Sequence, residues 1–331
     1  MAPSPVPSGC GVCGMAKQLI LCTGCQAMPY CSQEHQDSHE AHKTACHDIQ
    51  DLKRRIEMAQ LQFQHGNRLV RYSLFANSRQ YMDAHWAVFN SLGRVHCVQS
   101  LEAQLDHATH MLKSSFMESF DTASIIPEIL LRLDRDQECY AFVRWWKTKQ
   151  KQYQWDNADF PVLSSIEVDP LESVAYFGKG RNDVFHLTCV ALLKVKLILD
   201  VLRLQQSTRT IGLRVPKEIL DLINTYVPRS PIVSASRDLI YGSYKNRWIL
   251  IAKLESQVKL LYQLILSADK NFWDDLMKTK QDLIRASPDP PVWGHTEVRA
   301  LLLRRVCSAC VEIPGTVDYI RALVMAVDSR R

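Results

Sequence analysis

Cysteine and histidine are concentrated at the amino terminus of this chain, and their spacing constrains how it can fold more than any other feature does. Six of the 11 cysteines lie in the first 46 of 331 residues, and the stretch YCSQEHQDSHEAHKTAC at 30–46 adds three histidines. Eight of these residues form four pairs with short internal spacing. The pairs are Cys10 with Cys13, Cys22 with Cys25, Cys31 with His35, and His42 with Cys46.

Each pair has a spacing that suits two ligands of one metal ion. In a C-x2-C pair, one tight turn directs both thiolates at the same ion, and residues four apart on a helix lie on adjacent turns of one face. Eight thiolate and imidazole ligands predict two tetrahedral zinc sites. A segment of this length cannot build a stable core unaided, whereas zinc binding in finger peptides contributes roughly 10–16 kcal/mol. Ordinary buried cysteines are therefore the weaker interpretation.

The motif C-x2-C, C-x2-C, YC-x3-H, H-x3-C resembles the MYND zinc finger, whose third-pair signature is similar to YCSQEHQ. The resemblance implies an interleaved arrangement, in which the first and third pairs bind one ion and the second and fourth pairs bind the other. It also implies a protein-interaction module, because several MYND fingers bind short proline-containing peptides. The implied ligands are Cys10, Cys13, Cys31 and His35 for one zinc ion and Cys22, Cys25, His42 and Cys46 for the other.

Two departures from the family pattern concern the last pair. The gap from His35 to His42 is one residue shorter than usual, and the tryptophan common before the last histidine is missing. His39 is therefore an alternative ligand to His42. We prefer His42, because it keeps the H-x3-C spacing to Cys46, and we expect His39 to face solvent on a helix.

A zinc ion held by three thiolates and one histidine has no position open for water or substrate, so both sites are expected to be structural. The charge of residues 1–46 argues against nucleic acid as the partner of the finger. This segment contains two lysines and three acidic residues, and each zinc ion with its three thiolates adds a further negative charge. Binding phosphate requires the opposite sign. A protein partner is therefore expected, with a short proline-containing peptide as one candidate.

Composition sets the broad class and the expected compartment. The chain is 47 % hydrophobic and 23 % charged, with a net charge of +5, which is ordinary for a globular protein. The start MAPSPVPSGC lacks the basic and apolar runs of a signal peptide, so we expect reduced thiols in the nucleus or the cytoplasm. The most apolar segment, 184–204, contains four charged residues, which predicts a buried core helix and no membrane span.

The rest of the chain, 47–331, has helical periodicity and predicts an all-α domain after the finger at 1–46. Residues 47–67 are expected to form an exposed charged helix. Two helix–turn–helix units within about 79–147, with turns at 92–94 and 134–135, suggest a tetratricopeptide-like array, and a plain helical bundle is the alternative. Further helices are expected at about 184–205, 215–226, 237–267, 270–285, 296–311 and 316–327, with connectors at 156–183, 227–236 and 286–295.

Three features outside the finger could suggest function, and for each we favour a structural role. Cys307 and Cys310 lie in an apolar helix, and at least one of Trp145 and Trp146 lies on the apolar stripe of its helix, so core packing is expected for both pairs. His107 and His110 are expected on a solvated helix face. The segment LLRLDRDQECYAFVRWW at 130–146 resembles fungal MYND-finger proteins with a helical region of unassigned activity.

The sequence thus predicts a zinc-binding adaptor that is not an enzyme and whose finger recognises a protein. Two alternatives stay open. A MYND-containing lysine methyltransferase would pair the finger with a strand-rich catalytic domain and an Asn-His-Ser-Cys motif, and that motif does not occur in the sequence. A DNA-associated transcriptional regulator would use the positive balance of the helical part, although that part has no dense basic stripe.

Overall fold

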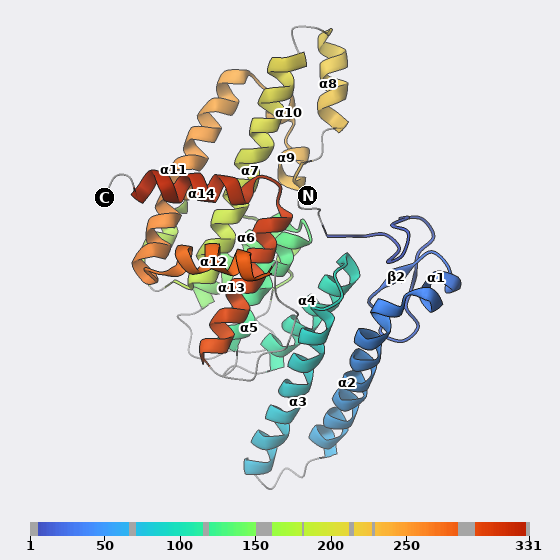
Figure 1. The fold of residues 1–331 in the computed structure, drawn as a ribbon. Coiled ribbons are helices and arrows are strands. Elements are labelled where there is room, and N and C mark those ends of the chain that lie inside the picture. The colour runs from blue at the N-terminus through green and yellow to red at the C-terminus, as the bar shows by residue number, and fades with distance from the viewer. Residues whose placement is uncertain are drawn as a thin grey trace. The chain divides into compact units, whose positions relative to one another are not determined.

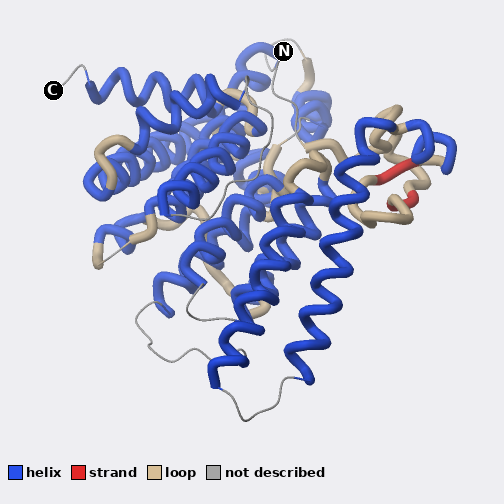
Figure 2. Tube along the Cα trace, turned by 60° about the horizontal axis from the view of Figure 1, so that its bottom comes forward, coloured by secondary structure: helices blue, strands red, loops and turns tan. Residues whose placement is uncertain are grey.

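The computed structural model describes residues 6–65, 71–114, 119–149, 161–180, 182–211, 215–226, 229–283 and 295–328. The chain divides into two compact units, and each is described here by itself. The N-terminal unit comprises 4–129 with 288–290, and the C-terminal unit comprises 130–287 and 291–331 with 1–3. In the described residues all regular secondary structure is helical except for two short strands, and loops connect the elements (Figure 2). The predicted fold class, mainly α with a small finger at the amino terminus, is confirmed.

The N-terminal unit begins with the finger and continues into long helices (Figure 1). Strands β1 and β2 pair antiparallel, with Ile20 opposite Tyr30 and Leu21 opposite Pro29. Helix α3 packs against both α2 and α4. The elements are β1 (Ile20–Leu21), β2 (Pro29–Tyr30), α1 (Gln33–Ser38), α2 (Glu40–His65), α3 (Arg71–Leu92), α4 (Val98–Ser114) and α5 (Ser119–Arg132), within which the division between the units falls.

Helix α2 differs from the expected exposed helix at 47–67. It starts at Glu40, inside the finger, and the described part ends at His65. Ile49, Ile56 and Ala59 are buried, and α2 packs along α3. These apolar residues are seven and three positions apart and share a helix face, so one face of an otherwise charged helix enters the core. The predicted domain boundary after residue 46 lies inside this helix, and it stays a prediction.

Both predicted helix–turn–helix units are present. Helix α3 ends at Leu92 and α4 begins at Val98, while α5 ends at Arg132 and α6 (Asp136–Lys149) follows at once. The second turn is tight, because Asp134 adopts a left-handed backbone conformation with φ of 56°. Whether the pairs form a tetratricopeptide-like array stays a prediction.

The C-terminal unit is built around α7 (Val184–Ile211), which packs against α6, α11, α13 and α14. Residues 184–204 form the predicted core helix. None of the helices in the described residues is long and apolar enough to cross a membrane. The other elements of this unit are η2 (Leu163–Ser165), η3 (Val174–Gly178), α8 (Lys217–Tyr226), α9 (Pro231–Ala235), α10 (Arg237–Tyr241), α11 (Tyr244–Ala268), α12 (Phe272–Leu283), α13 (His295–Glu312) and α14 (Thr316–Asp328).

Two details of this unit differ from the prediction. The expected helix at 237–267 is two helices, because the chain breaks at Gly242 and Ser243 begins α11 as its N-cap, accepting a hydrogen bond from the Asn246 amide. The connector expected at 227–236 contains the short helix α9, which begins with Pro231 at a first-turn position. Most of the connector at 286–295 lies outside the described residues.

Two lysines of α7 are buried and have polar partners, of which Asp136 is buried and Asp134 is exposed. Lys196 donates to Asp134 and Asp136 at 2.6 and 2.7 Å. The Lys194 ammonium donates to the carbonyl oxygens of Pro170 and Glu172. These pairings satisfy the charges that interrupt the apolar run in the sequence.

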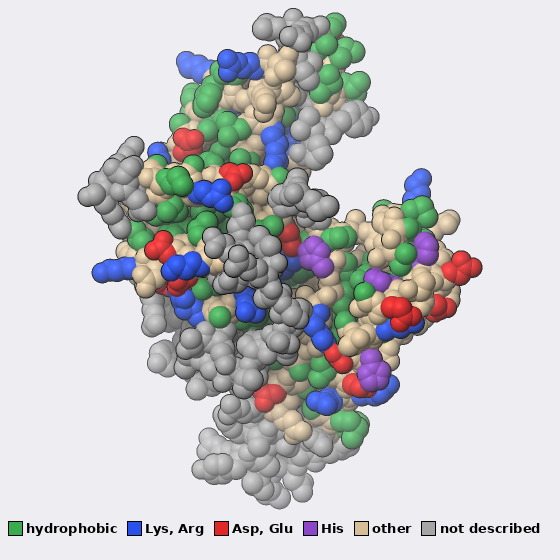
Figure 3. Space-filling model, viewed as in Figure 1, with side chains coloured by type: hydrophobic (Ala, Val, Ile, Leu, Met, Phe, Trp, Pro, Cys, Tyr) green, Lys and Arg blue, Asp and Glu red, His purple; other side chains and the backbone are tan. Residues whose placement is uncertain are grey.

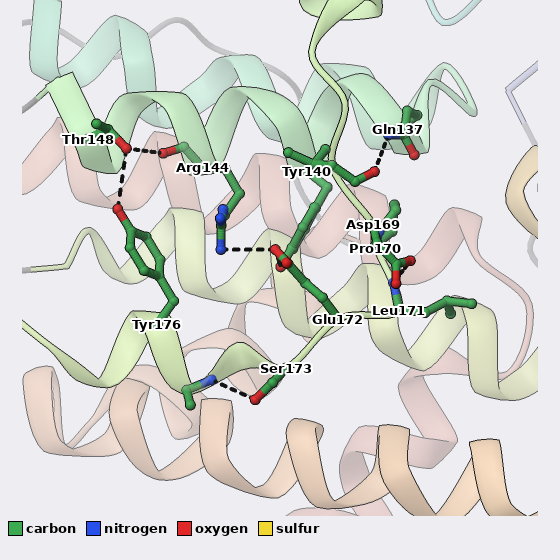
Figure 4. A network of polar contacts seen from close by, with 12 residues as sticks. Gln137, Tyr140, Arg144, Thr148, Asp169, Pro170, Leu171, Glu172, Ser173 and Tyr176 are labelled. Carbon is green, nitrogen blue, oxygen red and sulfur yellow. Dashed lines mark hydrogen bonds and ion pairs between the residues drawn. The ribbon is translucent and has the colours of Figure 1, made fainter.

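The irregular segment before α7 is held against α6 by side chains (Figure 4). The Glu172 carboxylate accepts from the Tyr140 hydroxyl at 2.8 Å and pairs with Arg144 at 2.9 Å. The Tyr176 hydroxyl lies 3.3 Å from Thr148 Oγ1. This network supplies partners for a segment that has little regular secondary structure. Cys307, Cys310 and Trp146 are buried, as expected for core residues.

Candidate metal centres

The structure brings Cys10, Cys13, Cys31 and His35 into one group, whose ligand atoms all lie within 4.8 Å of one another. The Sγ atoms of Cys13 and Cys31 are 3.6 Å apart, and His35 Nδ1 lies 3.1 Å from Cys31 Sγ and 3.5 Å from Cys10 Sγ. Sulfur ligands about 2.3 Å from a tetrahedral zinc ion are separated by about 3.8 Å. The group thus has nearly the dimensions of a zinc site.

The second group consists of Cys22, Cys25, His42 and Cys46, with the same limit of 4.8 Å between ligand atoms. Cys22 Sγ lies 3.6 Å from Cys46 Sγ, and Cys25 Sγ lies 3.3 Å from His42 Nε2. His42 faces this group through Nε2, whereas His35 faces the first group through Nδ1. The grouping is the interleaved one that the resemblance implied.

The two C-x2-C pairs lie in similar turns. In the first turn, the Gly14 amide donates to the Cys10 carbonyl at 2.8 Å. In the second, the Gln26 amide donates to the Cys22 carbonyl at 2.9 Å. Gly14 and Gln26 both have positive φ, 74° and 58°. This conformation closes each loop so that both thiols face the same point.

Helices α1 and α2 supply three of the remaining four ligands, and the fourth, Cys31, lies just before α1. Ser32 caps α1 by accepting from the His35 amide, which fixes the first helical turn after Cys31. His42 and Cys46 lie on adjacent turns of α2, four residues apart, and therefore share a face. Helix α2 thus carries half of the second group.

Residues 10–46 match the MYND finger family. The match covers the segment that contains both ligand groups and no more of the chain. No curated protein and no solved structure matches the chain. MYND fingers mediate interactions between proteins, and this finger contains two Cys3His zinc-binding sites, consistent with two structural zinc ions.

The chemistry of the donor atoms in the MYND finger fits a divalent cation. Burial, with a smaller contribution from the neighbouring Cys22 and Cys46 thiolates, raises the pKa of the Cys25 thiol to about 12, although the amides of Ala27 and Met28 oppose this rise. At Cys10 burial also raises the pKa, but the amides of Cys13 and Val12 outweigh it and lower the value to about 6. The positive charge of a bound cation outweighs the repulsion among the crowded thiolates. A thiol that coordinates the cation is therefore deprotonated outright.

His39 differs from its predicted role. It is half-buried at the end of α1, its Nδ1 lies 3.0 Å from the Tyr30 hydroxyl, and its ring stacks on His42 at 5.8 Å. Tyr30 is fully buried in the MYND finger and also contacts the His42 ring. His39 therefore lies outside both ligand groups but packs against a member of the second, and it does not face solvent on a helix.

His107 and His110, expected on a solvated helix face, form a cluster with His85 between α3 and α4, in which His107 is half-buried and His110 is exposed. His107 Nδ1 lies 2.9 Å from Nδ1 of the buried His85, and His110 stacks on His85 at 4.5 Å. His110 Nε2 lies 2.6 Å from the Tyr81 hydroxyl. Burial is the main cause that lowers the pKa of His85 to about 3 and that of His107 to about 4. The sequence indicated that His107 and His110 share one helix face, but it gave no signal that a face of α3 packs against them.

Two residues beyond the MYND finger, which the ligand spacing does not indicate, also contact the second ligand group. Gln50 donates to Cys46 Sγ, and Lys53 donates to the Cys25 carbonyl. The position of Gln50 contains a usable signal, because it is four residues after Cys46 and shares its helix face. The contact made by Lys53 depends on how the finger folds back on α2.

Proposed function

We propose that the chain is a regulatory adaptor, without catalytic activity of its own, whose MYND finger recognises a protein partner. The observation that supports this most directly is that the finger exposes several large apolar side chains on its surface, although its chain is folded around two metal sites. Val12, Met15, Ile20 and Leu21 are 44–57 % exposed. Exposed apolar groups concentrated on so small a module are typical of a surface that contacts another protein.

The metal centres support a binding role because their ligands are complete. Three thiolates and one imidazole fill a tetrahedral zinc ion and leave no position for substrate. The strands in the described residues are the two short ones of the finger, which suits a helical scaffold better than a strand-rich methyltransferase domain.

The charge of the finger favours a protein over nucleic acid. Figure 3 shows acidic, histidine and a few basic side chains among apolar ones on the face of the finger that is visible there, and residues 1–46 contain one more acidic residue than lysine. Such a surface lacks the positive excess that binding to phosphate requires. A short proline-containing peptide is one candidate ligand, and the reduced thiols required by the zinc sites suit the nucleus or the cytoplasm.

The test is affinity purification with mass spectrometry, in which the intact protein is compared with two kinds of variant. Cys13→Ala/Cys25→Ala breaks both metal sites, whereas Ile20→Asp/Leu21→Asp changes only exposed side chains of β1. Met325→Asp is the matched control, because Met325 is 65 % exposed in the other unit.

We expect one set of partners to be lost from both finger variants and retained by the control. Zinc analysis should still give two ions per chain for Ile20→Asp/Leu21→Asp, which separates loss of the surface from loss of the fold. An unchanged partner list in both finger variants would contradict the proposal and would make the finger a structural cap.

A further inference from the structure

The two zinc centres differ in what surrounds them. Among the described residues, the side chains of the first group make their hydrogen-bonding contacts with one another and with the backbone of the finger. One of its members, Cys13, is exposed. In the second group Cys22, Cys25 and His42 are buried and Cys46 is half-buried. The second centre is therefore the less accessible one.

Residues of the helical part reach the second centre directly. The Gln50 amide donates to Cys46 Sγ at 3.3 Å, and the Lys53 ammonium donates to the Cys25 carbonyl at 2.7 Å. At the start of α4, the Cys97 thiol donates to the Ala27 carbonyl at 3.1 Å. All three donors lie beyond residues 10–46, and they bind one ligand sulfur and two carbonyls of the turn that carries Cys25.

Packing holds these donors in place. The cores of the finger and of α2 to α4 are continuous. A Cβ atom on Gly24 would lie 1.9 Å from Gln50 Nε2 and 2.8 Å from Cys46 Sγ, so only glycine leaves room for the amide against the turn. The core cluster joins Cys22, Cys25 and Tyr30 to Ile49, Ile56, Val88, Leu92, Val95 and Cys97.

We propose that Gln50 and Lys53 are positioning residues that retain the zinc ion at the second centre, formed by Cys22, Cys25, His42 and Cys46. This ion then leaves more slowly than the ion that Cys13 helps to bind at the first centre. A zinc ion with three thiolates carries a net negative charge. An N–H group that donates to a ligand sulfur spreads that charge and makes the thiolate a poorer target for protons and chelators. A lysine ammonium beside the same turn adds a favourable positive charge and ties the turn to α2.

The experiment measures zinc release from the full-length, zinc-loaded protein into excess chromogenic chelator. We expect two phases of one ion each. Cys13→Ala should leave a single ion that departs with the slow rate, which assigns the slow phase to the second centre. Gln50→Leu/Lys53→Met should accelerate that phase about 10-fold or more, because loss of groups that support metal ligands typically costs 10–100-fold in affinity. The fast phase should keep its rate.

Two control substitutions make the same chemical changes on the same helix. Gln60→Leu and Lys43→Met alter exposed residues of α2, and Lys43 pairs with Glu40, not with the turn that carries Cys25. Neither should change either phase. Gln50→Met, which nearly keeps the side-chain volume, serves if the double variant loses its helical circular dichroism.

Three results would overturn the proposal. An unchanged slow phase in the variants of Gln50 and Lys53 would remove their role. Equal acceleration of both phases would indicate general loosening of the finger. Release of the single ion of Cys13→Ala at the fast rate would reverse the order of the two centres.

Discussion

The buried ion pair between Lys196 and Asp136 gives the sharpest test of the C-terminal unit. The Asp136 side chain is fully buried and lies 2.7 Å from the Lys196 ammonium, whose side chain is 9 % exposed. Burial raises the pKa of Asp136 to about 6, and Lys196 partly opposes that rise. Lys196→Met would leave a buried carboxylate without its cation, which typically costs about 3–5 kcal/mol.

The cost should depend on pH in a known direction. A carboxyl group whose native pKa is raised above its unfolded value destabilises the native state above that pKa, and the penalty disappears as the pH falls through it. Without Lys196 the pKa of Asp136 should rise further, so the variant regains stability on acidification before the parent does. At about 1.36 kcal/mol per pKa unit, the difference between the two proteins should shrink by roughly 2 kcal/mol from pH 7.5 to 5.5.

Urea denaturation followed by tryptophan fluorescence measures this, because six of the seven tryptophans lie after residue 130. The free energy of unfolding is compared between variant and parent at each pH, so acid effects on the zinc sites cancel. Lys259→Met, an exposed lysine on α11, is the matched control and should change stability by less than about 0.5 kcal/mol. A loss below about 1 kcal/mol, or one that is equal at both pH values, would refute the reasoning.

Two further predictions concern the N-terminal unit. Elemental analysis should give two zinc ions per chain for the parent and about one for Cys25→Ala, because that thiol belongs to one ligand group alone; a folded parent without zinc would refute the metal assignment. Burial first, and then the positive charges of nearby histidines, lowers the pKa of His85 to about 3, so its unfolded form takes up protons below about pH 6.5 and the native state loses stability as the pH falls. Tyr81, His107 and His110 surround His85, and the positive charge of Lys53 lowers the pKa of His107. At pH 5.5 the loss is about 1.4 kcal/mol, so His85→Phe should show a shallower decline than the exposed-site control His96→Phe when the opening free energy of α3 is followed by amide hydrogen exchange. Parallel pH profiles for these two variants would contradict the prediction.

The sequence alone determined the metal chemistry of this protein. Ligand type and spacing are local properties, since a C-x2-C turn and an i,i+4 pair on a helix each direct two donors at one ion whatever the rest of the chain does. The helical class of the remainder followed equally from periodicity, and the turns after Leu92 and at Asp134 lie where the sequence predicted them.

The tertiary structure decided which faces meet, because contacts between segments far apart in the sequence have no local signal. It packed one face of the charged helix α2 against α3, gathered His85, His107 and His110 into one cluster, and buried Lys196 beside Asp136. It also brought Lys53 to the turn that carries Cys25, 28 residues away in the sequence. Burial determines whether such a polar group is solvated or must find a partner, and burial depends on the whole fold.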